Sequence, residues 1–241
     1  MKKVIITGNA HPILKQTLSE KNFDVSYEPL ISYEEIKAKG AGVAGLVLTT
    51  RIKVDQELID SLPQLEWIGR LGSGMELVDV EYAKSKGITC VSSPEGNRNA
   101  VAEHSLGMLL MLMNKMNIAV PEVKQGIWLR DENRGTELYG KKVGIIGYGN
   151  TGSSFARLLQ PFDVTVLAYD KFKKDFGNSY VKETPLDVVL EEAEIISFNV
   201  PLTSDTHHML NAGFLEKLKQ KPIILSACRG KVINTADLIN G

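Results

Sequence analysis

The chain of 241 residues is 43% hydrophobic and 24% charged, a composition typical of a globular protein with one large core or two modest ones. Its 28 basic and 29 acidic side chains give a formal net charge of −1 and are scattered without blocks, so we expect no nucleic-acid partner and no membrane partner. The two cysteines, Cys90 and Cys228, suit neither a disulfide framework nor a CxxC metal pair, which predicts a cytoplasmic protein without a bound metal.

Short β-rich runs alternate with helix-like segments through the first part of the chain. The predicted strands are residues 3–7, 24–27, 45–49, 66–70 and 88–91. The predicted helices, with apolar residues three or four positions apart, are residues 12–21, 32–39, 55–62 and 79–86. This alternation predicts a parallel sheet with helices on both faces.

A turn-rich segment, residues 92–97, ends the alternation, and a long helix is predicted from residue 99 to about residue 117. We therefore place a domain boundary after Asn97, which gives domains of residues 1–97 and 98–241. The long helix is apolar on more than one face, which predicts burial in a core or in a subunit interface. Its apolar run at residues 106–113 is too short to span a membrane.

A second α/β series opens at Lys141. Its predicted strands are residues 142–146, 164–168, 194–199 and 222–226, with a helix at residues 153–160 and another that starts near Thr235. The chain therefore reads as two successive α/β units without a short internal repeat.

The segment Gly147-Tyr148-Gly149-Asn150-Thr151-Gly152 joins a predicted strand to a predicted helix. A glycine pattern alone is weak, but the strand, turn and helix order is the one that dinucleotide binding requires. Gly147 permits a tight turn, Gly149 lets the backbone approach a pyrophosphate, and Gly152 lets the helix pack close to the strand. The alternative is a doubly wound domain with a glycine-rich turn and no ligand.

An acidic residue, Asp170, ends the next predicted strand at the expected separation from the turn. A carboxylate there accepts hydrogen bonds from the ribose hydroxyls and repels a 2′-phosphate, so NAD is favoured over NADP. Lys171 follows, and it either softens this discrimination or is a solvated surface lysine.

Two further segments, residues 198–203 and 226–230, lie at the carboxyl ends of predicted strands, where ligands bind in such folds. Arg229 in the second segment either pairs with a substrate carboxylate and polarises the adjacent keto oxygen or forms a structural ion pair. The residues alone do not choose between these roles.

Several more motifs occur in order along the chain. They are Arg70-Leu71-Gly72-Ser73-Gly74-Met75, Asn97 with Val101-Ala102-Glu103-His104, the run from Glu137 to Gly147, Asn199-Val200-Pro201-Leu202-Thr203, and Ala227-Cys228-Arg229-Gly230. Together they resemble the D-isomer-specific 2-hydroxyacid dehydrogenases, and above all the phosphoglycerate dehydrogenase-like members. The resemblance covers nearly the whole chain and is far more specific than the glycine pattern.

The resemblance implies a flavodoxin-like substrate domain followed by a Rossmann NAD-binding domain, with the active-site cleft between them. The loop that matches Gly72, Ser73 and Gly74 offers backbone N–H groups to the substrate carboxylate in the family, and the arginine that matches Arg229 holds the carboxylate and keto oxygen. Besides Tyr148 and the glycines of the turn, the residues expected around NAD are Asn150, Thr151, Asp170, Val200, Pro201, Thr206, Ala227 and Cys228. The long helix and the Trp128 loop usually form a dimer, so a homodimer is expected.

The chain departs from the family pattern in two places. The family's general acid/base is a histidine beyond the arginine, held by a glutamate, and the chain stops at Gly241 before either. We therefore expect the Rossmann sheet to be truncated before its last strands and these 241 residues to be inactive by themselves. Many relatives have an arginine where Thr49 stands, so Arg51 either reaches the substrate or remains exposed.

The leading hypothesis is an NAD-dependent oxidoreductase that transfers a hydride between nicotinamide and a D-2-hydroxy acid of the phosphoglycerate, hydroxypyruvate or glyoxylate type. The alternative is an NAD-binding regulatory protein of the same fold, similar to a corepressor, that does not turn over substrate.

Overall fold

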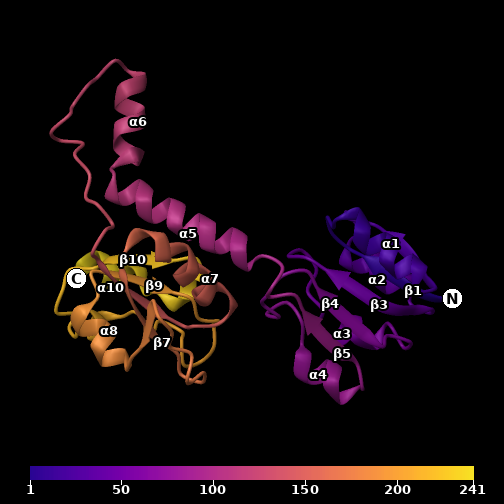
Figure 1. Cartoon of the computed structure of the whole chain (residues 1–241). Coiled ribbons are helices and arrows are strands. Elements are labelled where there is room, and N and C mark those ends of the chain that lie inside the picture. The colour runs from indigo at the N-terminus through magenta and orange to yellow at the C-terminus, as the bar shows by residue number, and fades with distance from the viewer. The chain divides into compact units, whose positions relative to one another are not determined.

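Two parallel β-sheets organise the chain, one in each of two units. The computed structural model describes residues 1–241, and the units are Met1–Asn97 and Arg98–Gly241 (Figure 1). Buried apolar clusters form within each unit, so each has the core that a layered α/β structure requires. None of the helices combines the length and apolar character needed to cross a membrane.

The sheet of the first unit is parallel throughout, with the strand order β2-β1-β3-β4-β5. Its strands are β1 (Lys2–Ile6), β2 (Phe23–Tyr27), β3 (Val43–Leu48), β4 (Trp67–Arg70) and β5 (Thr89–Ser92). Its helices are α1 (Pro12–Glu20), α2 (Tyr33–Lys39), α3 (Gln56–Asp60) and α4 (Val80–Ser85). This is the flavodoxin-like order, and the predicted elements are confirmed with their ends shifted by one or two residues.

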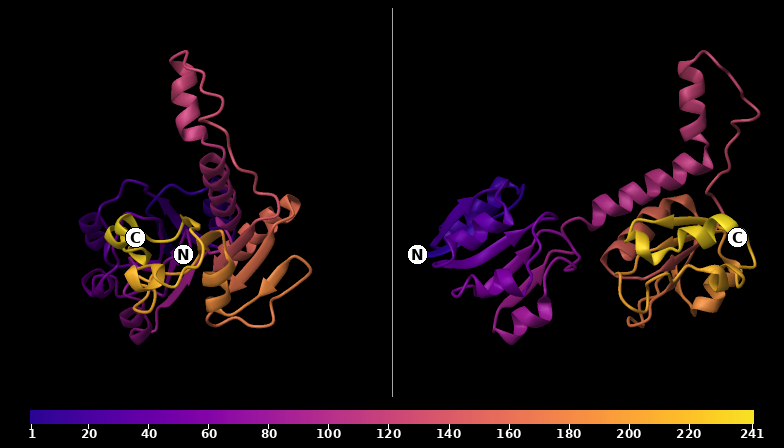
Figure 2. Two further views of the ribbon diagram at one scale, coloured as in Figure 1. Left: turned by 90° about the vertical axis from the view of Figure 1, so that its left-hand side faces the viewer. Right: turned by 180° about the vertical axis from the view of Figure 1, so that it is seen from behind.

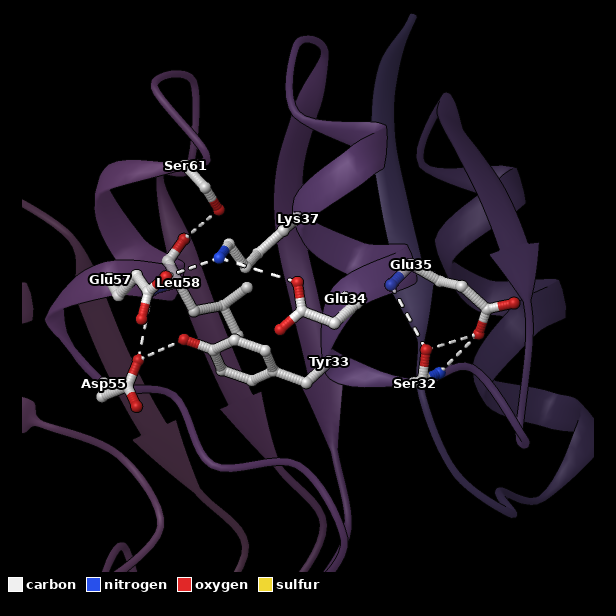
Figure 3. Close-up of polar contacts among 9 residues, drawn as sticks. All are labelled: Ser32, Tyr33, Glu34, Glu35, Lys37, Asp55, Glu57, Leu58 and Ser61. Carbon is white, nitrogen blue, oxygen red and sulfur yellow. Dashed lines mark hydrogen bonds and ion pairs between the residues drawn. The ribbon is translucent and has the colours of Figure 1, made fainter.

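Side-chain caps define where two helices of this unit begin (Figure 3). Ser32 and Glu35 form a reciprocal capping box at the start of α2, which satisfies two free backbone donors. Asp55 caps α3 by accepting from the Leu58 backbone N–H at 3.2 Å, and it also accepts from the Tyr33 hydroxyl at 2.6 Å. The Tyr33 hydrogen bond is the main cause that holds the pKa of Asp55 below its ordinary value, so the two helices are joined through an ionised cap.

The sheet of the second unit is also parallel, with the order β10-β9-β6-β7-β8. Its strands are β6 (Lys142–Ile146), β7 (Thr165–Tyr169), β8 (Val181–Glu183), β9 (Ile195–Phe198) and β10 (Ile223–Ser226). Its α-helices are α5 (Arg98–Met113), α6 (Met116–Lys124), α7 (Asn150–Leu159), α8 (Leu186–Glu192), α9 (Ala212–Leu215) and α10 (Thr235–Asn240). If β6 to β10 are numbered 1 to 5, the order read from β8 to β10 is 3-2-1-4-5. This is the Rossmann arrangement as far as its fifth strand.

The predicted helix over residues 99–117 is wrong near its end, because the chain forms two helices there. Lys115 adopts a left-handed conformation with φ of 51°, and the Met113 carbonyl accepts a hydrogen bond from the Thr136 backbone N–H. A left-handed residue and a carbonyl bonded outside the helix are both typical of a helix end. The second helix, α6, projects from the end of α5 (Figure 2).

Candidate functional site

The centre of the second sheet is the point at which the strand order reverses. β6 lies between β7 and β9, and the loops that leave these three strands emerge at the same edge because the strands are parallel. Ligands of open α/β sheets bind at this edge and at this reversal. The predicted cofactor residues lie on these loops, in the first turn of α7 (Asn150–Leu159) and on the neighbouring loop after β10.

Two glycines of the turn between β6 and α7 are required by the packing of the chain itself. Gly147 has φ of +93°, and a Cβ atom there would lie 2.6 Å from the Asn199 carbonyl oxygen. A Cβ atom on Gly152 would lie 2.0 Å from the Gly147 carbonyl oxygen. Both neighbours are backbone atoms, so a side chain at either glycine would displace the turn or the adjacent loop.

Gly149 differs, because no neighbouring atom lies within 4 Å of the position that its Cβ would take. Its φ of −80° and ψ of −152° are open to other residues, and it is the N-cap of α7 without a side-chain cap. The backbone of Gly149 is therefore unobstructed at the N-terminus of α7, which has no side-chain cap. The free N–H groups and the helix dipole at this end favour an anion. The residues present fit a pyrophosphate.

Asp170 fastens the turn to the end of β7. Its carboxylate accepts from the backbone N–H of Tyr148 at 2.7 Å and from those of Phe172 and Lys173 at 2.9 Å each. Burial raises the pKa of this carboxyl, but the backbone donors outweigh it and the net pKa lies below the ordinary value. Asp170 is thus an ionised acid that retains acceptor capacity, since a carboxylate offers about four lone-pair sites.

The Tyr148 side chain supports the loop that follows Asp170. Its ring is 4% exposed and stacks on Phe176 with the ring centroids 4.4 Å apart. The Lys173 ammonium lies 5.2 Å from the centroid of the Tyr148 ring. Tyr148 therefore contacts the loop after β7 through its ring and the Asp170 carboxylate through its backbone N–H.

The loop after β9 contributes Val200, Pro201 and Thr206. Val200 lies beside the turn, with its Cγ1 atom 3.0 Å from the position of a Cβ on Gly147. The Thr206 hydroxyl donates to the Pro201 carbonyl at 2.6 Å and accepts from the Thr203 backbone N–H at 2.8 Å. Thr206 therefore closes this loop, and its predicted contact with a cofactor stays a prediction.

Ala227, Cys228 and Arg229 follow β10, whose neighbour in the sheet is β9. All three are half-buried, and the Cys228 sulfur lies 3.1 Å from the Ser226 hydroxyl oxygen. The Arg229 carbonyl accepts from the Val232 backbone N–H at 2.9 Å, which fixes the backbone from which this side chain leaves. These residues share the sheet edge with the glycine turn, as the sequence predicts.

The predicted substrate loop, Gly72-Ser73-Gly74, follows β4 in the first unit. Gly72 has φ of +141°, and its carbonyl accepts from the Ser93 backbone N–H. The Arg70 side chain folds back onto this loop, since a Cβ on Gly72 would meet its Nη1 atom at 1.6 Å. The buried Nε atom of Arg70 has no hydrogen-bond partner, and sequence reasoning assigned this residue no role. The sequence feature that could have indicated Arg70 is an arginine at the end of a predicted strand, next to the glycine loop.

Arg51, the other predicted substrate residue, holds backbone carbonyls together in the first unit. Its Nη2 atom donates to the carbonyls of Pro29 at 2.8 Å, Ile31 at 3.0 Å and Thr7 at 3.3 Å. Part of its donor capacity is therefore used within the protein. A contact with substrate remains a prediction.

Comparison with known proteins places these features in a family. Residues 106–241 match the model of the D-isomer specific 2-hydroxyacid dehydrogenase NAD binding domain. The chain is 32% identical over 234 residues to D-3-phosphoglycerate dehydrogenase of Archaeoglobus fulgidus, which covers 95% of this chain and 44% of that protein. It is 34% identical over 189 residues to hydroxypyruvate reductase of Thermotoga maritima, covering 78% of this chain and 61% of the relative.

A solved structure of D-lactate dehydrogenase from Aquifex aeolicus, complexed with NAD and lactic acid, matches with a TM-score of 0.83 and 27% identity. The match covers 99% of this chain and 72% of that one. The chain spans less than half the length of the phosphoglycerate dehydrogenases that it matches. The domain match and the glycine turn agree that the cofactor is NAD.

Two glycines of the turn, Gly149 and Gly152, predict separable effects of alanine substitution. Gly152→Ala should lower the free energy of unfolding by about 1–3 kcal/mol through overpacking against backbone. Gly149→Ala should leave stability nearly unchanged and weaken NADH binding by about tenfold, because the methyl group fills the approach to the turn. Urea unfolding and fluorescence titration with NADH measure the two effects.

Gly107→Ala is the matched control, because a Cβ there also meets nothing within 4 Å and the residue is an exposed position of α5. It should leave NADH binding unchanged. Equal loss of NADH affinity in Gly107→Ala and Gly149→Ala would contradict the assignment of Gly149.

Proposed function

Since the chain belongs to the D-isomer-specific 2-hydroxyacid dehydrogenases, we propose that it carries the cofactor site and part of the substrate site of an NAD-dependent dehydrogenase of D-2-hydroxy acids. The observation that carries the proposal is the open backbone at Gly149 beside the uncapped N-terminus of α7. The ionised Asp170 beside the same turn supports it. Bound NAD supplies the hydride acceptor for oxidation of the substrate hydroxyl.

Residues of both units have roles in the proposed reaction. The Gly72-Ser73-Gly74 loop donates backbone N–H groups to the substrate carboxylate, which orients the acid. Arg229 pairs with the carboxylate and polarises the keto oxygen of the oxidised product. Asp170 accepts from the ribose hydroxyls with the lone pairs that its three backbone donors leave unused.

For the substrate, we propose a small acid without a phosphate group, such as hydroxypyruvate or glyoxylate. A phosphate is typically held by several cations, and two candidate cations of the first unit have partners within the protein. Arg51 donates to three carbonyls, and Lys53 lies 3.7 Å from the Asp55 carboxylate. Thr49, at the position where the family resemblance implies an arginine, has no charge.

A homodimer is the assembly that we propose. Apolar side chains of α6 and the segment after it are exposed, and they include Met116, Ile118, Val120, Val123 and Trp128. The Trp128 side chain is 77% exposed. Several exposed apolar side chains on one segment are typical of protein interfaces, and burial against a second copy would remove them from water.

The substrate proposal predicts the outcome of an activity panel. The protein that contains this chain should oxidise NADH with hydroxypyruvate or glyoxylate at a higher kcat/KM than with the phosphorylated keto acid 3-phosphohydroxypyruvate. Initial rates of NADH absorbance loss measure this. Preference for the phosphorylated acid would reverse the substrate proposal, and NADH binding without turnover of any acid would favour the regulatory alternative.

Asp170 predicts the choice of cofactor. The unmodified protein should bind NADH more tightly than NADPH, because its carboxylate repels the charge of a 2′-phosphate. Asp170→Ser should weaken NADH binding by the equivalent of one or two charge-assisted hydrogen bonds, roughly 1.5–3 kcal/mol each. Fluorescence titration gives both dissociation constants, with the exposed Glu191→Ser as a control that should change neither. Tighter binding of NADPH by the unmodified protein would remove Asp170 as the ribose-reading residue.

The dimer proposal predicts that a charged side chain placed in the interface converts the dimer to a monomer. Sedimentation velocity should show a dimer for the unmodified chain and a monomer for Ile118→Asp, because an unpaired charge in a buried interface is unfavourable. Leu30→Asp, at an apolar side chain of the first unit that is 85% exposed, should remain dimeric. A monomeric unmodified chain at all concentrations would refute the proposed interface.

A further inference from the structure

An ion pair joins the loop after β7 to the loop after β9. The Lys171 ammonium lies 2.5 Å from an Asp205 carboxylate oxygen. β6 and its glycine turn lie between the two strands in the sheet. The pair therefore links the loops on either side of the strand from which the dinucleotide turn leaves.

Each partner is adjacent in the chain to a predicted cofactor residue, Lys171 to Asp170 and Asp205 to Thr206. Lys171 directly follows Asp170, the proposed ribose contact, whereas Asp205 lies on the loop that Thr206 closes. The hydrogen bond to Asp205 raises the pKa of Lys171, and the same bond lowers the pKa of Asp205. Both groups are therefore charged at neutral pH.

The other two lysines of this loop have partners of a different kind. Lys173 lies over the rings of Tyr148 and Phe176, and the Lys174 ammonium donates to the Asp170 carbonyl at 3.4 Å. Lys171 is the loop lysine that forms an ion pair with a carboxylate, whereas the charge of Lys173 helps to lower the pKa of Asp170. Because Lys171 adjoins Asp170, it is also the cation nearest in sequence to the position that a 2′-phosphate would occupy.

The exposure of the Lys171–Asp205 pair limits its contribution to folding stability. The side chains of Lys171 and Asp205 are 56% and 60% exposed, and exposed ion pairs add little to folding stability. Removing the carboxylate should therefore leave the fold intact and change chiefly where the lysine ammonium lies.

We propose that Asp205 is a specificity-determining residue for NAD: its carboxylate holds the Lys171 ammonium away from the ribose end of the site, so that the lysine adds no affinity for the 2′-phosphate of NADP. This inference rests on the proposed ribose contact of Asp170. Cofactor choice is then set by two acids, of which Asp170 repels the phosphate directly and Asp205 withdraws the cation that would attract it.

Titration with NADH and NADPH in a double-mutant cycle tests the proposal. Asp205→Asn should lower the Kd for NADPH by about three- to tenfold, because the released ammonium can make a charge-assisted contact with the phosphate. The Kd for NADH should change by less than about twofold. Glu192→Gln, which removes the carboxylate of the exposed Lys142–Glu192 pair of the same unit, is the matched control and should change neither constant.

The lysine distinguishes this account from simple removal of a negative charge. Lys171→Ala alone should leave the Kd for NADPH within about twofold of its original value, whereas in the Asp205→Asn background it should abolish the gain. An equal gain from Asp205→Asn with and without Lys171 would overturn the proposal, as would no gain at all. Failure of the unmodified protein to bind NADH would instead overturn the cofactor site itself and this inference with it.

Discussion

The close approach of three backbone segments at Gly147 is the constraint on which the cofactor site depends. The Asn199 carbonyl oxygen lies 2.6 Å from the position of a Cβ on Gly147, and the Gly147 carbonyl oxygen lies 2.0 Å from the position of a Cβ on Gly152. These contacts bring the end of β6, the start of α7 and the loop after β9 to one point. The backbone at Gly149, in contrast, has no neighbour in the position of a Cβ. The N–H groups at the start of α7 therefore remain accessible to a ligand.

Asp170 connects this turn to the next strand, and its position explains how one carboxylate serves both structure and selectivity. Three backbone donors fix the orientation of its oxygens and keep it ionised. A charge that is already fixed needs little reorganisation when a ligand arrives. The stacked rings of Tyr148 and Phe176 hold the loop that supplies two of those donors, so the aromatic contact contributes to the site indirectly.

The sequence predicts the central strands of the two sheets well because these strands are buried on both faces and therefore read as apolar runs. β3 is the clearest case, with all six residues buried. β8 escaped prediction because it has only three residues, of which Lys182 is exposed. The break between α5 and α6 escaped it as well, because it depends on the tertiary contact of Met113 with Thr136, which no local pattern contains.

Within the site, the glycine turn and Asp170 could be predicted because their residue types follow from backbone geometry and charge. The partners of Lys171, Thr206 and Arg51 could not be predicted, since they lie 34, 5 and up to 44 residues away in the chain.

The most direct test of the account is a crystal structure of the chain with NAD. It should show the pyrophosphate against the Gly149 backbone at the N-terminus of α7 and the adenosine ribose hydroxyls on Asp170. A dinucleotide bound elsewhere, with Gly149 and Asp170 free of it, would contradict the account.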